Sequence, residues 1–247
     1  MANPRRAALI TGSNKNIGRA CALHLARAGC NVVINGSRDV AAAEQVAAEA
    51  RELGVDALVA MGDVGKRADL DRIVGAALAK FGVVDILVNN AAIRQDGRFL
   101  EMSEDAWRYA MAVNFDAAYV LARALLPGMI GKGWGRIINF AGMNAIHGYN
   151  GRAHVSASKH AAWGLTKALA KEFGPSGITT NIVSPGPIMG EAQDKAQAEH
   201  IAPMKARVPL GRLGTPDEVA AVVALLASDQ GGFINGQLIQ VNGGAET

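Results

Sequence analysis

Short, continuously apolar runs alternate with longer runs of helical periodicity along nearly the whole chain. The short runs are rich in Val, Ile and Leu and are predicted as strands at 7–11, 31–35, 56–61, 85–89, 136–140, 179–183 and 237–241. The helical runs fall at 17–28, 40–53, 66–81, 103–129, 153–173 and 216–227. Strands that are apolar on both faces need cover on both faces. The alternation therefore predicts an α/β fold, a doubly wound parallel sheet of about seven strands with helices on both faces.

No change in composition, linker-like stretch or repeat divides the chain. Its 247 residues, half of them hydrophobic, suffice for one large core, so residues 1–247 are predicted to form a single domain. One long insertion interrupts the rhythm at 184–215, and a short helix is expected within it around 192–206. Insertions beyond the carboxyl end of a strand often form lids over ligands. We expect a substrate lid here; the alternative is an ordinary surface excursion.

Charge and composition argue against several classes of protein. The net charge of +3 is spread along the chain without the clustered basic stripe that a nucleic-acid surface needs. No apolar stretch reaches the length of about 18 residues that spans a membrane, and the apolar run near the N-terminus is too short for a secretory signal. The two cysteines, Cys21 and Cys30, are expected to be reduced rather than paired or metal-bound. These features predict a cytoplasmic protein with no metal site, no membrane contact and no nucleic-acid partner.

The run TGSNKNIG, at residues 11–18, connects the first predicted strand to the first helix. A pyrophosphate can approach the backbone N–H groups at a helix N-terminus, where the helix dipole is positive. Gly12 permits a tight turn, and Gly18 permits close contact between helix and strand. Asn16 stands where a dinucleotide loop usually has its middle glycine, and Asn tolerates a positive φ better than other side chains. The loop therefore predicts a Rossmann-type dinucleotide site.

Several motifs follow this loop in order and together resemble those of the short-chain dehydrogenase/reductase family, in particular its 3-oxoacyl-acyl-carrier-protein-reductase-type members. TGSNKNIG is similar to the family's TGxxxGxG fingerprint, Asn89-Asn90-Ala91-Ala92 to its NNAG motif, and the tail FINGQLIQVNGG to its last strand. The resemblance implies a cofactor site built from Gly12, Asn14, Lys15, Asn16, Ile17, Gly18, Ser37, Arg38, Asp63, Val64, Asn90, Ala91, Ala92, Lys159, Pro185, Gly186 and Ile188.

The end of the second strand bears on the choice of cofactor. NAD-specific members of the family carry a carboxylate there for the ribose hydroxyls, whereas this chain has Gly36, and Asp39 comes too late. Lys15, Ser37 and Arg38 are candidates to neutralise a 2′-phosphate; the alternative is that the cations are merely solvated. We therefore predict NADP(H) in preference to NAD(H).

The catalytic region departs from the family pattern. In the family, a tyrosine four residues before the active-site lysine handles the proton, and a serine thirteen residues before that tyrosine helps to hold the substrate oxygen. The corresponding residues here are Val155 and Gly142, while Asn114 and Lys159 match the family's asparagine and lysine. Valine has no proton to donate. The ordinary proton relay is therefore absent.

Four side chains are candidates to replace it. Tyr149 and His147 lie in the loop at 142–152, before the helix at 153–173; the alternative for both is that they merely line the pocket. His154 adjoins the vacant position but points about 100° away round the helix. The alternative for His154 is a capping or packing role. Lys159 either binds only the nicotinamide ribose or, with no phenol in front of it, acts as the acid directly or through a water.

These residues leave three classes of function open. The first is an NADP(H)-dependent oxidoreductase that acts on a small carbonyl or alcohol by an atypical proton relay. The second is a non-redox NADP(H) sensor or a catalytically silent partner subunit, and the third is a lyase or isomerase on the same scaffold. The resemblance also implies a homodimer or homotetramer that pairs through the helices at 103–129 and 153–173.

Overall fold

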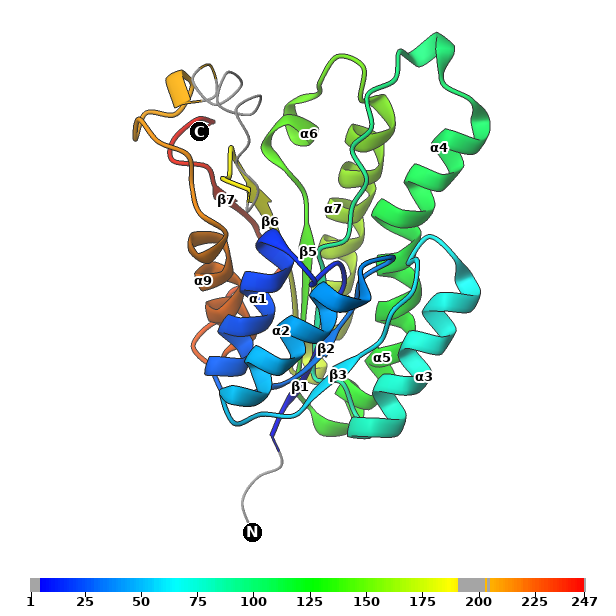
Figure 1. The fold of residues 1–247 in the computed structure, drawn as a ribbon, viewed down its shortest axis with the longest axis vertical. Coiled ribbons are helices and arrows are strands. Elements are labelled where there is room, and N and C mark those ends of the chain that lie inside the picture. Colours follow the sequence, from blue (N-terminus) through cyan, green and yellow to red (C-terminus); the bar gives the residue numbers. More distant parts are fainter. Residues whose placement is uncertain (1–4, 191–202, 204, 247) are drawn as a thin grey trace.

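The computed structural model describes residues 5–190, 203 and 205–246, and its centre is a seven-stranded, all-parallel sheet of order β3-β2-β1-β4-β5-β6-β7. The strands are β1 (Ala7–Ile10), β2 (Asn31–Ile34), β3 (Ala57–Val59), β4 (Ile86–Asn89), β5 (Gly135–Phe140), β6 (Ile178–Pro185) and β7 (Leu238–Val241). Helices cover both faces of this sheet (Figure 1). The predicted doubly wound Rossmann fold is confirmed.

One face of the sheet is covered by α1 (Asn16–Arg27), α2 (Val40–Glu52) and α9 (Pro216–Ala227). Small apolar side chains dominate this layer, so helices and strands approach closely, and α1 packs against α9. Cys21 and Cys30 are free thiols buried in the same layer. Burial raises the pKa of the Cys21 thiol to about 12, which keeps it protonated and unreactive.

The opposite face is covered by α3 (Arg67–Phe81), α5 (Ala117–Lys132) and α7 (Ala153–Phe173). The helix predicted over 103–129 is instead α4 (Glu104–Met111), a π-helical turn (Ala112–Asp116) and then α5. Hydrophobic periodicity follows a 3.6-residue repeat and does not register the extra residue of a π turn. Ser103 is the N-cap of α4, because its hydroxyl accepts a hydrogen bond from the Ala106 N–H at 3.2 Å.

Short elements account for the other departures from the prediction. The segment 142–152, predicted as a loop, contains the short helix α6 (Met143–His147), and 3-10 turns lie at Phe99–Glu101 and Gly174–Ser176. The helix predicted around 192–206 lies mostly outside the described residues. The described ends of that insertion are joined, because the Met189 N–H donates to the Gly214 carbonyl at 2.8 Å and Gly214 donates to Pro187 at 3.0 Å.

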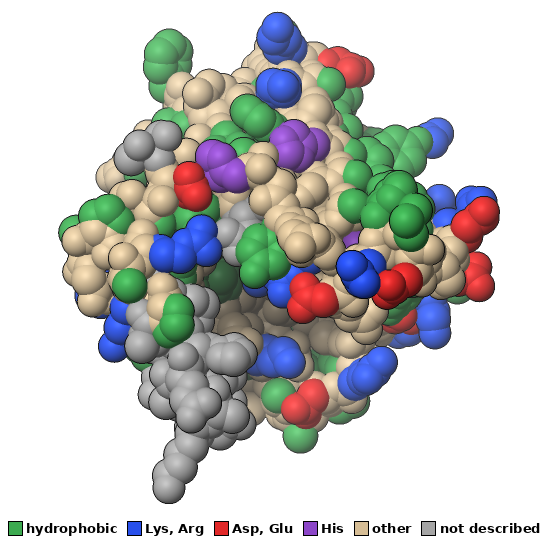
Figure 2. Space-filling view, turned by 90° about the horizontal axis from the view of Figure 1, so that it is seen from above, with side chains coloured by type: hydrophobic (Ala, Val, Ile, Leu, Met, Phe, Trp, Pro, Cys, Tyr) green, Lys and Arg blue, Asp and Glu red, His purple; other side chains and the backbone are tan. Residues whose placement is uncertain are grey.

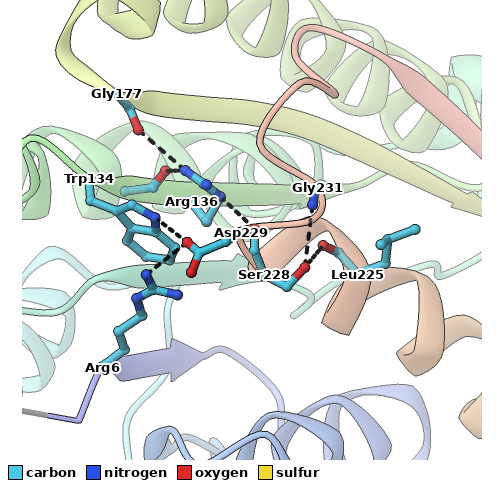
Figure 3. A network of polar contacts seen from close by, with 9 residues as sticks. Arg6, Trp134, Arg136, Gly177, Leu225, Ser228, Asp229 and Gly231 are labelled. Carbon is cyan, nitrogen blue, oxygen red and sulfur yellow. Dashed lines mark hydrogen bonds and ion pairs between the residues drawn. The ribbon is translucent and has the colours of Figure 1, made fainter. Parts of the chain in front are cut away.

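A polar network closes the amino end of the sheet (Figure 3). The Trp134 ring lies between two guanidinium groups, 3.6 Å from Arg6 and 4.2 Å from Arg136. Its Nε1 donates to Asp229 at 2.9 Å, and Arg6 forms an ion pair with the same carboxylate at 2.8 Å. Arg136 donates to three backbone carbonyls, those of Gly135, Gly177 and Ser228. The network ties the starts of β1 and β5 to the end of α9.

Among the helices that the structure describes, none combines the length and the apolar character needed to cross a membrane.

Candidate active site

A cleft of about 650 Å³ opens at the carboxyl end of the strands, where the strand order reverses between β1 and β4. Open α/β sheets bind ligands at this position. Figure 2 shows that face of the molecule hollowed near its centre, with Lys and Arg side chains in and around the hollow. The predicted site residues that line the cleft are Gly12, Asn14, Lys15, Asn16, Ile17, Gly18, Ser37, Asp63, Val64, Asn90, Ala91, Ala92, Tyr149, Lys159, Pro185, Gly186 and Ile188. Arg38, Asn114, His147 and His154 do not line it.

The loop between β1 and α1 has the backbone that a dinucleotide site requires. Gly12 has φ +62°, and Asn16, with φ +49°, is the one non-glycine residue with positive φ in the described part of the chain. The expectation that asparagine replaces glycine at a left-handed position is therefore confirmed. Lys15, the N-cap of α1, provides no side-chain cap for the helix. The amino end of α1 therefore faces the cleft without a side-chain acceptor from its own N-cap, as an anion site requires.

Gly18 packs directly against this loop. A Cβ added at Gly18 would overlap the Gly12 carbonyl oxygen and lie 2.6 Å from the Asn90 side-chain nitrogen. That nitrogen donates to the Thr11 and Gly12 carbonyls at 2.9 and 3.0 Å. The segment after β4 thus holds the loop after β1, and no side chain fits between the loop and the helix.

The residues after β2 leave the cleft without a carboxylate at the position predicted to select NAD. A Cβ at Gly36 would lie 3.0 Å from the Asn14 side chain, so a larger residue is crowded there. The Asp39 carboxylate instead accepts the Ala42 N–H at 2.9 Å and caps α2. Ser37 lines the cleft, whereas Arg38 lies outside the lining.

Asp63 is held in the wall of the cleft by two donors. Its carboxylate accepts from the Tyr109 hydroxyl and from the Gly65 N–H, each at 2.9 Å. Desolvation and the Asp63 hydrogen bond raise the pKa of Tyr109 above its usual range. Tyr109 also lines the cleft and was missed in the sequence, because it comes from α4, 46 residues away from Asp63.

Asn114 lies in the π-helical turn behind the cleft wall and is 5% exposed. Its side-chain oxygen accepts the Ile93 N–H at 2.8 Å, and its nitrogen donates to the Ile93 carbonyl at 3.1 Å. The same nitrogen donates to the Ser158 hydroxyl at 3.3 Å. Asn114 therefore fastens the loop after β4 to α7, next to Lys159.

Lys159 reaches the cleft from a buried position on α7 and is only 2% exposed. Among the described residues, its ammonium has neither a hydrogen-bond acceptor nor an acidic partner. Burial, followed by the nearby Arg94 charge, lowers the pKa of Lys159 to about 7. The amine is therefore divided between its protonated and neutral forms near neutral pH, which suits a group that gives and takes protons.

Val155 and Gly142 border the cleft beside this lysine. Val155 lies one helical turn before Lys159 and therefore on the same side of α7. A Cβ added at Gly142 would meet no atom within 4 Å. Ser156 also lines the cleft, and its hydroxyl is buried without a hydrogen-bond partner among the described residues.

Comparison with known proteins agrees with this geometry. The family model described as enoyl-(acyl carrier protein) reductase matches residues 12–246. The chain is 35% identical to a 3-oxoacyl-(acyl-carrier-protein) reductase of Staphylococcus aureus over 97% of both chains. It is 36% identical to one of Synechocystis, over 96% of this chain and 95% of the relative. A crystal structure of a putative gluconate dehydrogenase from Agrobacterium tumefaciens superposes with a TM-score of 0.89 at 33% identity, over 98% of this chain and 96% of that one.

The chain belongs to the short-chain dehydrogenase/reductase family. Two of the motifs on which the resemblance was based, TGSNKNIG and the segment Asn90-Ala91-Ala92, meet at one cleft in the structure, whereas the tail motif does not line it.

The candidate substitutes for the family's tyrosine differ in position. Tyr149 lines the cleft, is 47% exposed, and has the Arg152 guanidinium 4.9 Å above its ring. His147 lies outside the lining, and its Nε2 is 3.5 Å from a carboxylate oxygen of Glu246. His154 is also outside the lining and buried, and desolvation lowers the pKa of its imidazole. Of the three, only Tyr149 is brought together with Lys159.

Several cleft residues of this short-chain dehydrogenase/reductase were missed in the sequence, and three of them are cations. Arg94 follows β4, Arg152 precedes α7, and Arg207 lies near the end of the insertion. Charged residues in three separate loops carry no periodic signal that would place them together.

Proposed function

We propose that this chain is an NADP(H)-dependent oxidoreductase that reduces a small carbonyl compound, or oxidises the matching alcohol, with Lys159 in place of the usual tyrosine as the proton-handling group. The observation that carries the proposal is Lys159 itself. It is a buried amine that faces the cleft, has no partner among the described residues, and has a pKa of about 7.

The cofactor half of the proposal is supported by the loop after β1. The backbone conformations of Gly12 and Asn16, and the contact at Gly18, fit a dinucleotide pyrophosphate. The absence of a carboxylate at Gly36 and the capping role of Asp39 favour a phosphorylated ribose, for which Lys15 at the cleft and the nearby Arg38 are the cations. When bound, the nicotinamide supplies the hydride.

The part of the proposal that concerns proton transfer is supported by the residue next to Lys159 in the cleft, Val155. As hydride reaches the carbonyl carbon, the oxygen gains negative charge and needs one proton to become the alcohol. Val155 has none to give, and a protonated Lys159 supplies it directly or through a water, then regains one from solvent. In the reverse direction the neutral amine accepts the proton. A donor whose pKa lies near the working pH is efficient in both directions.

The test begins with cofactor binding. We expect NADPH to bind about tenfold or more tightly than NADH in equilibrium titrations. Carbonyl compounds are then screened for consumption of NADPH. The rate of reduction should fall as the pH rises above about 7, because Lys159 loses its proton there. Tighter binding of NADH would overturn the choice of cofactor, and a rate that is flat to pH 9 would overturn the role of Lys159.

Val155 and Gly142 favour a second candidate, a catalytically silent NADP(H)-binding subunit. Both positions that handle the substrate oxygen in the family lack a polar side chain here. Open space around Gly142 leaves room for a serine, so the double variant Val155→Tyr, Gly142→Ser tests whether the site is otherwise competent. Turnover by the double variant alone, with tight NADPH binding by both proteins, would favour the silent subunit over the enzyme.

We further propose that the chain is a single cytoplasmic domain that assembles as a homodimer or homotetramer. The support is its family membership and the long apolar helices at one face of the sheet. Light scattering on the eluted protein should give twice or four times the monomer mass. A monomer at micromolar concentration would contradict this assembly.

A further inference from the structure

Positive charge collects in the cleft around Lys159. The cations that line it are Lys15, Arg94, Arg152, Lys159 and Arg207. Among the described lining residues Asp63 is the only acid, and its carboxylate is held by Tyr109 and Gly65 after β3. The part of the cleft formed by the loop after β4 and by α7 therefore has cations but no acid of its own.

Arg152 is neutralised and fixed in place. Its guanidinium donates twice to Asp96, at 2.5 and 3.3 Å, and lies over the Tyr149 ring. The hydrogen bonds to Asp96 raise the pKa of Arg152. A forked pair of this kind sets the orientation of both side chains. Arg152 therefore forms a fixed part of the cleft wall, and its charge is already balanced by Asp96.

Arg94 differs from Arg152 in having no partner. Among the described residues, it has no acidic partner and no hydrogen-bond acceptor; Asp96, two residues further on, is already bound to Arg152. Arg94 is an exposed residue that lines the cleft, and desolvation there, followed by the Arg152 charge, lowers the pKa of its guanidinium. The Arg94 charge also contributes to the lowered pKa of Lys159. A guanidinium that lines a cleft near two other cations, with no acid of its own, is stabilised when an anion joins it.

We propose that Arg94 binds the carboxylate of the substrate, and that the substrate class is small oxo acids and the corresponding hydroxy acids. This inference rests on the proposed function, because it names the substrate of the same cleft. A guanidinium offers parallel N–H donors that match the two oxygens of a carboxylate. With the carboxylate on Arg94, a neighbouring carbonyl lies on the side of the cleft where Lys159 provides the proton. A neutral carbonyl compound would leave the Arg94 charge uncompensated.

The experiment measures binding rather than turnover. The protein is saturated with NADP⁺, so that the cofactor phosphates already occupy their own cations. Calorimetric titration then compares a panel of two- to six-carbon 2-oxo and 3-oxo acids with their neutral amides, for example acetoacetate with acetoacetamide. We expect at least one acid to bind about tenfold or more tightly than its amide. A panel in which no acid binds better than its amide would overturn the proposal.

Arg94→Gln is the decisive variant, and Arg98→Gln is its matched control. Arg98 lies in the same segment, forms an exposed ion pair with Glu101 at 3.4 Å, and does not line the cleft. Arg94→Gln should abolish the preference for the acid and leave the dissociation constant of NADPH unchanged, whereas Arg98→Gln should change neither. Retention of the preference in Arg94→Gln would overturn the proposal, as would a loss of NADPH affinity, which would assign Arg94 to the cofactor. If Arg94→Gln does not fold, the comparison of acid with amide in the unmodified protein decides.

Failure of the proposed function is distinguishable from failure of this inference. Binding of acids without consumption of NADPH would reject the oxidoreductase and keep the carboxylate site. Consumption of NADPH with neutral carbonyl compounds only would keep the oxidoreductase and reject the carboxylate site.

Discussion

Buried charged side chains at the two ends of the central sheet differ in whether they have a partner. At the amino end, Asp85 has a side chain only 2% exposed, but it accepts from Lys132 at 2.6 Å and from the Ala7 N–H at 2.8 Å. At the carboxyl end, Lys159 is also 2% exposed and has no such partner among the described residues. One buried charge is fully satisfied, and the other is held beside an open cleft.

The same contrast extends to the arginines. Arg136 at the amino end donates to three carbonyls and stacks on Trp134, whereas Arg94 at the carboxyl end has no acceptor among the described residues. Burial without a partner, as at Lys159, costs stability, and a protein retains such a group where a ligand completes it. Under the proposed function, the amino end stabilises the fold and the carboxyl end serves binding and chemistry.

Replacing the unpaired lysine should have the largest effect on activity, without any loss of stability. We expect Lys159→Met to reduce the rate of NADPH consumption by about 10²- to 10⁴-fold, because the proton donor is lost. Its free energy of unfolding should stay the same or rise, since an apolar chain of similar length replaces an unsatisfied amine. Steady-state kinetics and urea unfolding of the same preparation measure both. A large loss of stability would show that the lysine is structural.

The stability of the protein should depend on pH through Lys159. Its pKa is about 7 in the folded chain against 10.5 for an ordinary lysine, so the unfolded chain binds the proton more tightly. The free energy of unfolding should therefore rise between about pH 7 and pH 10.5, relative to Lys159→Met, by on the order of 4 kcal/mol, and the difference should level off below about pH 6. Urea unfolding of both proteins at several pH values measures this. Parallel curves for the two proteins would contradict the shifted pKa.

Replacing the satisfied carboxylate should have the converse effect. Asp85→Ala leaves the Ala7 N–H and Lys132 without their acceptor, and we expect it to lower the free energy of unfolding by about 2–3 kcal/mol. The dissociation constant of NADPH should not change, because Asp85 lies at the far end of the sheet from the cleft. Weaker NADPH binding at unchanged stability would break the division between the two ends.

The exposed part of the amino-end network should contribute least. Arg6→Gln removes the ion pair to Asp229 and one cation stacked on Trp134; Arg6 is partly exposed and Asp229 is exposed. We expect a loss of about 0.5–1 kcal/mol in the free energy of unfolding, with no change in cofactor binding. A loss as large as that of Asp85→Ala would show that exposed charges at this end matter as much as buried ones.

The fold and the dinucleotide loop were predictable from the sequence because each depends on local patterns. Apolar strands, helical periodicity and the left-handed position at Asn16 are all properties of consecutive residues. The π-helical turn that places Asn114 was not predictable, since one extra residue leaves the hydrophobic pattern of the helix almost unchanged. The short helix Met143–His147 was missed in a segment whose glycines and polar residues favour a loop.

The polar content of the cleft was predicted less completely. Arg94 and Arg152 are 58 residues apart and meet only because the loops after β4 and β5 leave the same edge of the sheet. His147 and His154 lie close to the vacant position in sequence, yet the structure turns one toward Glu246 and buries the other. Proximity along the chain does not give the direction of a side chain.

Direct titration of Lys159 tests the central claim most simply and needs no substrate. Carbon-13 NMR of the lysine ε-carbons, assigned by comparison with Lys159→Met, follows its protonation in the free protein. The account predicts one lysine that titrates near pH 7 and is missing from the variant. If Lys159 titrates with the other lysines near pH 10, it is a paired or solvated cation, and the proposed proton relay is wrong.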